Sequence, residues 1–193
     1  SNNATGGAYV VDRWHHYESG PTYSTQQSTT APTGFYNSLL MTNTSASASP
    51  TYCFFGQRIE GLNTLDLNWG ISTASAVTVS FWVRSSVTGI YSISITNGGG
   101  DRSYPATYTI NAQNTWEYKT IVVPGCTDGT WSKDTANGIY LRFNLGSGAA
   151  RCGSSGSWQN GNYDGATGST GALSWANTLG ATFYRSEEHT SEL

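Results

Sequence analysis

Hydrophobic and polar residues alternate most regularly between Ser75 and Val123. In the run AVTVSFWVR, the residues of one parity are Val77, Val79, Phe81 and Val83, and those of the other are Thr78, Ser80, Trp82 and Arg84. A period of two is typical of a β-strand with one buried face. Two more runs of this kind follow, separated by turn residues, so the sequence predicts a set of antiparallel strands.

The last run of this stretch, TWEYKTIVVP, begins with the same alternation and then changes. Ile121, Val122 and Val123 stand in succession before Pro124 ends the strand. Three neighbouring apolar residues predict either a β-bulge or a strand with core on both of its faces.

Shorter runs extend the pattern to the rest of the chain. In GIYLRFNLG, Leu141 and Phe143 are expected to point into a core. Their neighbours Tyr140, Arg142 and Asn144 are then expected to point away from it. Further strands are predicted within residues 8–19, 22–30, 35–44, 51–61 and 173–184. About nine to eleven short strands without helices between them predict an all-β protein, an antiparallel β-sandwich of the jelly-roll type.

The length of 193 residues is enough for one sizeable core, and we expect a single domain over residues 8–184. Residues 1–7 are rich in Asn and Gly and are interpreted as a linker or the end of a preceding segment. Residues 146–172 form a long excursion rich in Gly, Ser and Asn. A loop of this length in a compact domain is usually functional or disordered.

Composition narrows the class of protein further. Only 11% of residues are charged, aromatic residues reach 13%, and no helical period is sustained, so an α/β enzyme core is not expected. The formal charge of −3 and the scattered basic residues argue against nucleic-acid binding. No apolar run is long enough for membrane insertion, and the first residues lack the form of a signal peptide.

The cysteines and histidines lack the spacing of metal ligands. Cys53, Cys126 and Cys152 lie far apart, and we interpret them as reduced core or loop residues, with a disulfide between two of them left open. His15 and His16 are adjacent, so on a strand they point to opposite faces and do not easily share one metal. We expect no cofactor. Structural calcium is the one ion left open, because carbonyls and single aspartates bind it without a sequence signature.

Motifs of the common enzyme classes are missing, including the nucleophile elbow, the P-loop, the dinucleotide-binding glycines and the HExxH helix. We therefore expect a protein that is not an enzyme and has no catalytic residues. The alternative is a glycan hydrolase, which needs two carboxylates across a glycosidic bond. No context marks out such a pair among Asp12, Glu18, Glu60, Asp66, Asp101, Glu117, Asp128, Asp134 and Asp164.

The sequence does offer the residue types of a sugar-binding site. Sugars present C–H faces to aromatic rings and hydroxyls to planar polar groups. Two sets of candidates have this make-up: the outward positions Trp82, Arg84, Tyr140, Arg142 and Asn144, if their strands lie in one sheet, and the loop residues Trp131, Trp158 and Tyr163. For both sets, the alternative is that the aromatic residues cover the edge of the sandwich or pack against a neighbouring subunit.

Several segments in combination resemble one known pattern, namely QRIEG, VTVSFWVRSS, DRSYPATYTINAQNTWEYKTIVVPG, IYLRFNLGSG and LGATFY. They are similar to a jelly-roll domain, like a carbohydrate-binding module, of bacteriophage tail fibre and tail-associated proteins, especially those of marine phages. The resemblance covers about residues 12–184. It implies an extracellular virion component that helps the phage tail to recognise carbohydrate on the host cell surface.

The resemblance ends after Tyr184. In the family the last strand continues with an apolar run and a glutamate, whereas this chain continues with RSEEHTSEL. That string resembles the translation of a sequencing adapter. We therefore expect residues 185–193 to be a non-native tail that packs against nothing, and the reading frame to be a truncated environmental fragment.

Three functions are compatible with these patterns. The first is a phage tail module that contributes to the recognition of host glycans. The second is a purely structural or oligomerisation domain of the tail, whose partners are other tail-fibre subunits, for example in a homotrimer. The third is an accessory module of a secreted glycan-active enzyme, which would need a catalytic domain beside it. The sequence names neither the host nor the sugar.

Overall fold

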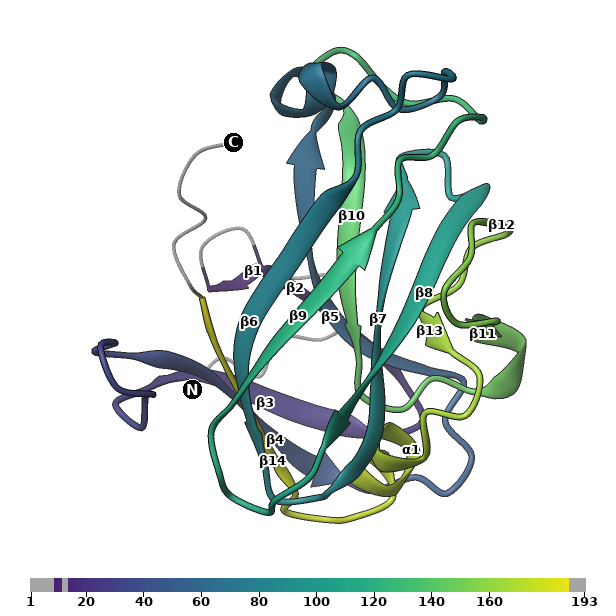
Figure 1. Cartoon of the computed structure of the whole chain (residues 1–193). Helices are drawn as coiled ribbons and strands as arrows, with labels where there is room; N and C mark the ends of the chain where they lie inside the picture. Colours follow the sequence, from purple (N-terminus) through teal and green to yellow (C-terminus); the bar gives the residue numbers. More distant parts are fainter. Residues whose placement is uncertain (1–8, 12–13, 188–193) are drawn as a thin grey trace.

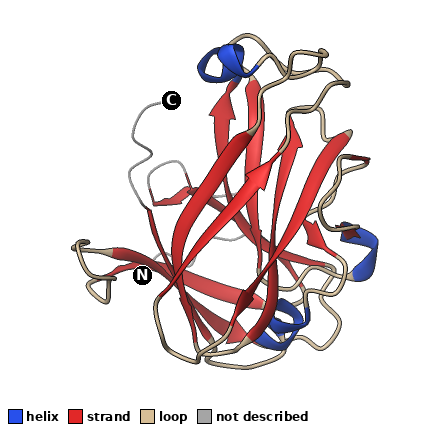
Figure 2. Ribbon diagram, viewed as in Figure 1, coloured by secondary structure: helices blue, strands red, loops and turns tan. Residues whose placement is uncertain are grey.

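The computed structural model describes residues 9–11 and 14–187, and these form the antiparallel β-sandwich that the sequence predicts (Figure 1, Figure 2). The first sheet has seven strands in the order β1, β2, β5, β10, β7, β8, β12, and the second has five in the order β3, β4, β14, β6, β9. The all-β fold class is therefore confirmed. In the described part of the chain, no helix is long and apolar enough to cross a membrane.

The elements have the following bounds. The first sheet consists of β1 (Tyr9–Val11), β2 (Trp14–Ser19), β5 (Tyr52–Glu60), β10 (Asn137–Asn144), β7 (Gly89–Asn97), β8 (Arg102–Ile110) and β12 (Gln159–Asn160). The second consists of β3 (Thr22–Ser28), β4 (Ser38–Ser45), β14 (Thr182–Glu187), β6 (Val77–Ser85) and β9 (Glu117–Val123). Two short parallel strands, β11 (Cys152–Gly153) and β13 (Gly165–Ala166), the helix α1 (Thr170–Ala176) and the 3₁₀ segments Gly61–Leu67 and Ala149–Arg151 complete the structure.

Aromatic rings dominate the core between the two sheets. Phe143 of β10 stacks on Phe55 of β5 with ring centroids 5.0 Å apart, and it meets Phe81 of β6 edge-on at 4.9 Å. All three side chains are fully buried. Val83 and Leu141 are buried as well, so the inward phase predicted for β6 and β10 is confirmed.

A helix replaces the first half of the strand predicted in residues 173–184. The chain forms α1 up to Ala176, and β14 begins only at Thr182. Ala172, Trp175 and Ala176 are buried together on one side of this helix, and Trp175 meets Tyr23 of β3 edge-on at 5.9 Å. The strand prediction is wrong here because a helix of seven residues, about two turns, is too short to show a sustained helical period in the sequence.

Two other strand predictions also need correction. The register of β9 with β6 is continuous from Glu117 to Val123, so the predicted bulge is wrong. Val122 is 62% exposed, which also excludes a core on both faces. Residues 8–19, predicted as one strand, contain both β1 and β2, and residues 12–13 lie outside the described part of the chain.

The strand β14 continues past Tyr184 and runs between β4 and β6. Arg185 and Ser186 are buried, and the Arg185 guanidinium lies 4.2 Å from the ring centroid of Trp14. Such a contact contributes about 2 kcal/mol when the cation is desolvated. The prediction that the chain packs against nothing after Tyr184 is therefore wrong for these residues. Residues 188–193 lie outside the described part, and the adapter origin of the tail stays a prediction.

An acid–base pair lies on the inward side of β2. A carboxylate oxygen of Glu18 is 3.8 Å from Nε2 of His16, and Nδ1 of His16 is 3.3 Å from the hydroxyl of Thr25. His16 is fully buried. The carboxylate oxygen Oε2 of Glu18 has no hydrogen-bond partner among the described residues. Desolvation by burial raises the pKa of Glu18 to about 7, so this carboxyl is largely protonated in mild acid.

Phe81→Ala should lower the free energy of unfolding by about 3–5 kcal/mol, because it removes a fully buried ring from the centre of the core. Val122→Ala, at an exposed position of the same sheet, is the control and should change it by about 0.5 kcal/mol or less. Urea denaturation measures both values. Similar losses in the two variants would contradict the strand phases described above.

Stability should fall between pH 4.5 and pH 7 through Glu18. Its folded pKa lies above the ordinary value of 4.5, so the contribution is complete below pH 4.5 and is lost as the pH rises through about 7. Because this carboxyl keeps some contact with solvent, we expect a change of about 1–2 kcal/mol. Glu18→Gln mimics the neutral acid and should flatten the profile, which urea denaturation at several pH values tests. Identical slopes in the two proteins would exclude Glu18 as the cause.

Candidate functional site

The outer face of the seven-stranded sheet carries a groove of about 460 Å³. It crosses β2, β5 and β10, which are neighbours in the sheet. The groove is lined by Tyr17, Thr51, Tyr52, Phe54, Arg58, Tyr140, Arg142 and Arg151. Phe54 points outward because the next residue, Phe55, belongs to the core. The volume falls within the range of roughly 300–1,000 Å³ that is usual for ligand sites.

Aromatic side chains make up half of this lining. Tyr17 stands directly opposite Phe54 in the ladder of β2 and β5, and their rings stack at 5.3 Å. Tyr140 meets Phe54 edge-on at 6.2 Å, and Tyr52 lies 6.4 Å from it. Phe54 and Tyr140 are buried, whereas Tyr17 and Tyr52 are half-buried. The two half-buried tyrosines are therefore the rings that a ligand could reach.

Gly56 allows the ring of Tyr140 to lie against β5. A Cβ atom at this position would stand 2.7 Å from Cε2 of Tyr140 and 2.5 Å from the carbonyl oxygen of Leu141. Both distances are shorter than real contacts of this type. Any side chain at this position would displace the ring or the strand, so the shape of the groove depends on this glycine.

The guanidinium groups of the groove lie over its rings. Those of Arg58 and Arg142 are 5.1 Å and 4.4 Å from the ring centroid of Tyr140, and that of Arg151 is 5.9 Å from the centroid of Tyr52. Arg58 is exposed, and its Nη2 donates to the hydroxyl of Tyr17 at 3.3 Å. Cation–π contacts hold the charged groups in place without neutralising them.

A buried carboxylate ties the groove to the excursion of residues 146–172. Asp164 is fully buried, and its Oδ1 accepts hydrogen bonds from Nη1 of Arg142 at 2.8 Å and from Nη2 of Arg151 at 2.9 Å. Its Oδ2 accepts from Nε of Arg151 at 2.8 Å. Nη1 of Arg142 also donates to Oδ1 of Asn162 at 2.6 Å. The excursion is thus an ordered part of the fold, seen beside β8 in Figure 1.

Two polar atoms of the groove residues lack partners among the described residues. They are the hydroxyl of Tyr140 and Nε of Arg142, and both are buried. Desolvation raises the pKa of Tyr140 and lowers the pKa of Arg142. Buried polar groups without hydrogen bonds are costly, and a ligand or an ordered water commonly supplies the missing partner.

The structure separates the first set of predicted site residues. Trp82 and Arg84 lie on β6 in the five-stranded sheet, whereas Tyr140 and Arg142 lie on β10 in the other sheet. The two pairs face outward on opposite sides of the sandwich, so the condition that their strands share one sheet is not met. The combined face predicted from the sequence is therefore wrong, and Tyr140 and Arg142 alone reach the groove.

Asn144, the fifth member of that set, is fully buried. Its Nδ2 donates to the hydroxyl of Ser92 at 3.1 Å, and its Oδ1 accepts from the backbone N–H groups of Gly146 and Ser147. Gly165 packs so closely against it that a Cβ there would be 2.3 Å from Nδ2 of Asn144. The amide holds the excursion on the sheet and is not accessible to a ligand.

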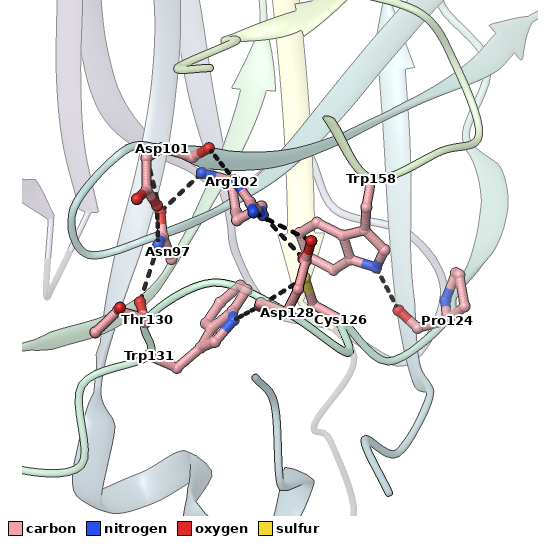
Figure 3. A network of polar contacts seen from close by, with 9 residues as sticks. All are labelled: Asn97, Asp101, Arg102, Pro124, Cys126, Asp128, Thr130, Trp131 and Trp158. Atoms are coloured by element: carbon pink, nitrogen blue, oxygen red, sulfur yellow. Dashed lines mark hydrogen bonds and ion pairs between the residues drawn. The ribbon is translucent and has the colours of Figure 1, made fainter. Parts of the chain in front are cut away.

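Two members of the second predicted set, Trp131 and Trp158, lie at one end of the sandwich. The indole N–H of Trp131 donates to the carbonyl oxygen of Asp128 at 3.0 Å, and that of Trp158 to Pro124 at 2.8 Å (Figure 3). Both rings also pack edge-on against Trp69, at 4.7 Å and 5.3 Å. The cavity beside Trp69 and Trp131 is only about 10 Å³. Their indole N–H groups are thus already engaged, and these rings close the end of the sandwich.

The remaining member of the second set, Tyr163, is half-buried and lies away from the two tryptophans in its packing. A Cβ added at Gly153 would stand 2.8 Å from its Cδ2, and one at Gly161 would stand 3.0 Å from its Cε2. The ring therefore covers two glycines of the excursion and does not line the groove.

The sequence did not single out Tyr17, Tyr52, Phe54, Arg58 and Arg151 as binding residues. One signal was available. In TYCFFGQRIEG both faces of the predicted strand carry large aromatic residues, since Phe54 and Phe55 are adjacent and point to opposite faces. A strand that is aromatic on both faces either lies in a two-sided core or carries a binding surface on its outer face.

The two histidines point to opposite faces of β2, as the strand pattern predicts. His16 lies in the core, and His15 stacks with Tyr17 on the outer face at 6.4 Å. Cys53, Cys126 and Cys152 are free thiols. Within residues 9–11 and 14–187, no three His, Cys, Asp or Glu side chains gather closely enough to hold a metal ion.

No protein-family model matches the sequence, and no curated protein is significantly similar to it. Among solved structures, the enzymatically active domain of tailspike protein 4 of bacteriophage CBA120 matches 95% of this chain at 13% identity and a TM-score of 0.48. This chain covers 20% of that tailspike chain.

Two carbohydrate-binding modules also match. A CBM4 structure matches 95% of this chain at 16% identity and a TM-score of 0.49, and the match covers 94% of the CBM4 chain. The C-terminal family 22 carbohydrate-binding module of Clostridium thermocellum Xyn10B covers 94% and is covered to 85%, at 14% identity and a TM-score of 0.41. Likenesses at this level do not assign a ligand to the groove.

Asp164→Asn should lower the free energy of unfolding by about 3 kcal/mol, because it leaves the buried Arg142 without its counter-ion. Asp128→Asn is the matched control. Asp128 also binds an arginine, Arg102, at 2.8 Å, but its side chain is 63% exposed, so we expect a loss below about 1 kcal/mol. Urea denaturation compares the two variants. Equal losses of stability in the two variants would show that the ion pairs of Asp164 do not hold the excursion of residues 146–172 on β10.

Proposed function

We propose that this domain is a non-catalytic carbohydrate-binding module that holds a glycan in the groove across β2, β5 and β10. The observation that carries the proposal is the combination of half-buried tyrosines with guanidinium groups in one groove on the outer face of a rigid sheet. Tyrosine rings pack against the C–H faces of sugars, and guanidinium N–H groups donate to their hydroxyl and ring oxygens.

The lining of the groove favours binding over hydrolysis. Glycosidases commonly use two carboxyl groups about 5–9.5 Å apart. None of the groove-lining residues is an aspartate or a glutamate. The neighbouring carboxylate, Asp164, is fully buried and bound by Arg142 and Arg151, so it cannot exchange protons with a sugar.

The biological setting follows from the sequence resemblance to phage tail proteins. We propose that the domain belongs to a tail fibre or tail-associated protein of a virion and contributes to attachment to carbohydrate on the host surface. The alternative setting is an accessory module of a glycan-active enzyme, which would use the same groove.

One observation favours a second role as a structural tail domain. The outer face of the five-stranded sheet exposes Val122 by 62% and Tyr118 by 45%, and Trp82 lies 5.3 Å from Tyr118. Apolar side chains gathered on one face are typical of contacts between subunits. This face is separate from the groove, so one domain can serve both purposes.

A glycan array should give a signal with the wild-type protein, and the double variant Tyr17→Ala/Tyr52→Ala should lose about tenfold or more in affinity, because both accessible rings of the groove are removed. Trp82→Ala/Tyr118→Ala is the matched control, since it removes two aromatic rings from the opposite sheet. Circular dichroism checks that both variants are folded. Loss of binding in the control alone would move the site to the other face, and no signal for any glycan would exclude the proposal.

A further inference from the structure

The charge of the groove is opposite to that of the whole chain. The formal charge of the chain is −3, and only nine residues are Lys or Arg. Three of these nine, Arg58, Arg142 and Arg151, line this single groove, and no Asp or Glu lines it with them. Concentration of cations in a concave, partly aromatic site attracts anions, because field lines are focused there.

The buried carboxylate of Asp164 does not cancel this charge. Asp164 is fully buried beneath the lining and forms ion pairs with Arg142 and Arg151 at 2.8 Å. Asp164 thus provides one negative charge against three guanidiniums. Glu60 lies two residues from Arg58 on β5, but neither residue belongs to any of the described ion pairs. We infer that the groove takes an acidic glycan, a sugar chain that carries carboxylate or sulfate ester groups, and this inference rests on the proposed function of the same site.

Arg58 is the residue that meets the anionic group. Its side chain is exposed, and its described polar contact is the bond from Nη2 to the hydroxyl of Tyr17 at 3.3 Å. Its guanidinium lies over the ring of Tyr140 at the lining of the groove, so its other N–H groups are available to a ligand there. A planar guanidinium offers several donors to two oxygens at once, which suits carboxylate and sulfate alike.

The buried residues of the groove give an independent reason for an anionic or strongly accepting ligand. The side chain of Arg142 is 7% exposed, and its Nε has no hydrogen-bond partner among the described residues. The hydroxyl of Tyr140 beside it is also buried without a partner. Two hydrogen-bond donors thus lack acceptors beside an excess of positive charge. A ligand with anionic oxygens would supply both the acceptors and the negative charge.

The opposite sheet provides a comparison within the same molecule. Arg84 also lies over a tyrosine ring, 4.8 Å from the centroid of Tyr184, and its Nε donates to the carbonyl oxygen of Asn114 at 2.9 Å. Arg84 does not line the groove. Arg84→Gln therefore removes the same charge and the same type of cation–π contact from the domain and leaves the groove unaltered.

Two pairs of probes separate acidic from neutral ligands. The first is polygalacturonate and its fully methyl-esterified form, which differ only in the carboxylate, and the second is dextran sulfate and dextran, which differ only in the sulfate ester. We expect the wild-type protein to bind the acidic member of at least one pair about tenfold or more tightly than the neutral member. A preference within the first pair indicates recognition of carboxylate, and a preference within the second pair indicates recognition of sulfate ester.

Arg58→Gln should weaken binding of that acidic probe by about tenfold more than it weakens binding of the neutral member of the pair, and it should make the remaining affinity less sensitive to salt. Arg84→Gln should bind like the wild type. Affinity electrophoresis or isothermal titration calorimetry measures the affinities, and denaturation curves confirm that both variants are folded.

The outcomes distinguish this inference from the proposed function. Equal affinity for the acidic and neutral members overturns the acidic ligand and leaves a neutral glycan in the groove. An unchanged preference for the acidic member in Arg58→Gln overturns the inference that this groove, through Arg58, holds the anionic group. Equal losses in Arg58→Gln and Arg84→Gln overturn it as well, because they indicate attraction by overall charge. No binding of any glycan, on the array or among the four probes, overturns the proposed function and the inference together.

Discussion

The antiparallel pairing of β5 with β10 is the constraint on which both the core and the groove depend. Phe55 stands opposite Phe143 on the inward side, and Arg58 stands opposite Tyr140 on the outward side. Because side chains alternate along a strand, one register sets both pairs. A slip by one residue would bring Tyr140 and Arg142 to the core side and expose Phe143. The packing of the aromatic core therefore also fixes the positions of the side chains in the groove.

Local alternation was enough to predict the strands and their phases. Phe81, Val83, Leu141 and Phe143 are buried as the period of two requires. Alternation says nothing about which strands share a sheet, because that depends on pairing between distant parts of the chain. The joint face of Trp82 and Tyr140 failed for this reason, although each residue does point outward. The helix α1 was missed because its seven residues, about two turns, are too few for a sustained helical period.

The composition of the groove could be predicted only in part. Tyr140 and Arg142 were identified from the outward phase of β10, but Tyr17 and Tyr52 belong to β2 and β5, which only the sheet brings beside them. Arg151 comes from a glycine-rich segment with no periodicity, and its position is set by Asp164. Conversely, Trp131 and Trp158 looked like a loop site, and the bonds from their indole N–H groups show that they belong to the framework.

The carboxylate of Asp164 links a segment that has the composition of a freely variable loop to a strand at the centre of the sheet. Loops of this kind normally tolerate substitution and insertion. Here Asp164 pairs with Arg142 of β10 and with Arg151 of the excursion itself, so replacement of Asp164 leaves the buried guanidinium of Arg142 uncompensated. A substitution of Asp164 therefore requires a compensating change at Arg142, and among homologous sequences we expect correlated substitutions between the excursion and β10. The ligand preference of the domain would then diversify first at Arg58, whose described contacts are with Tyr17 and Tyr140 and not with Asp164.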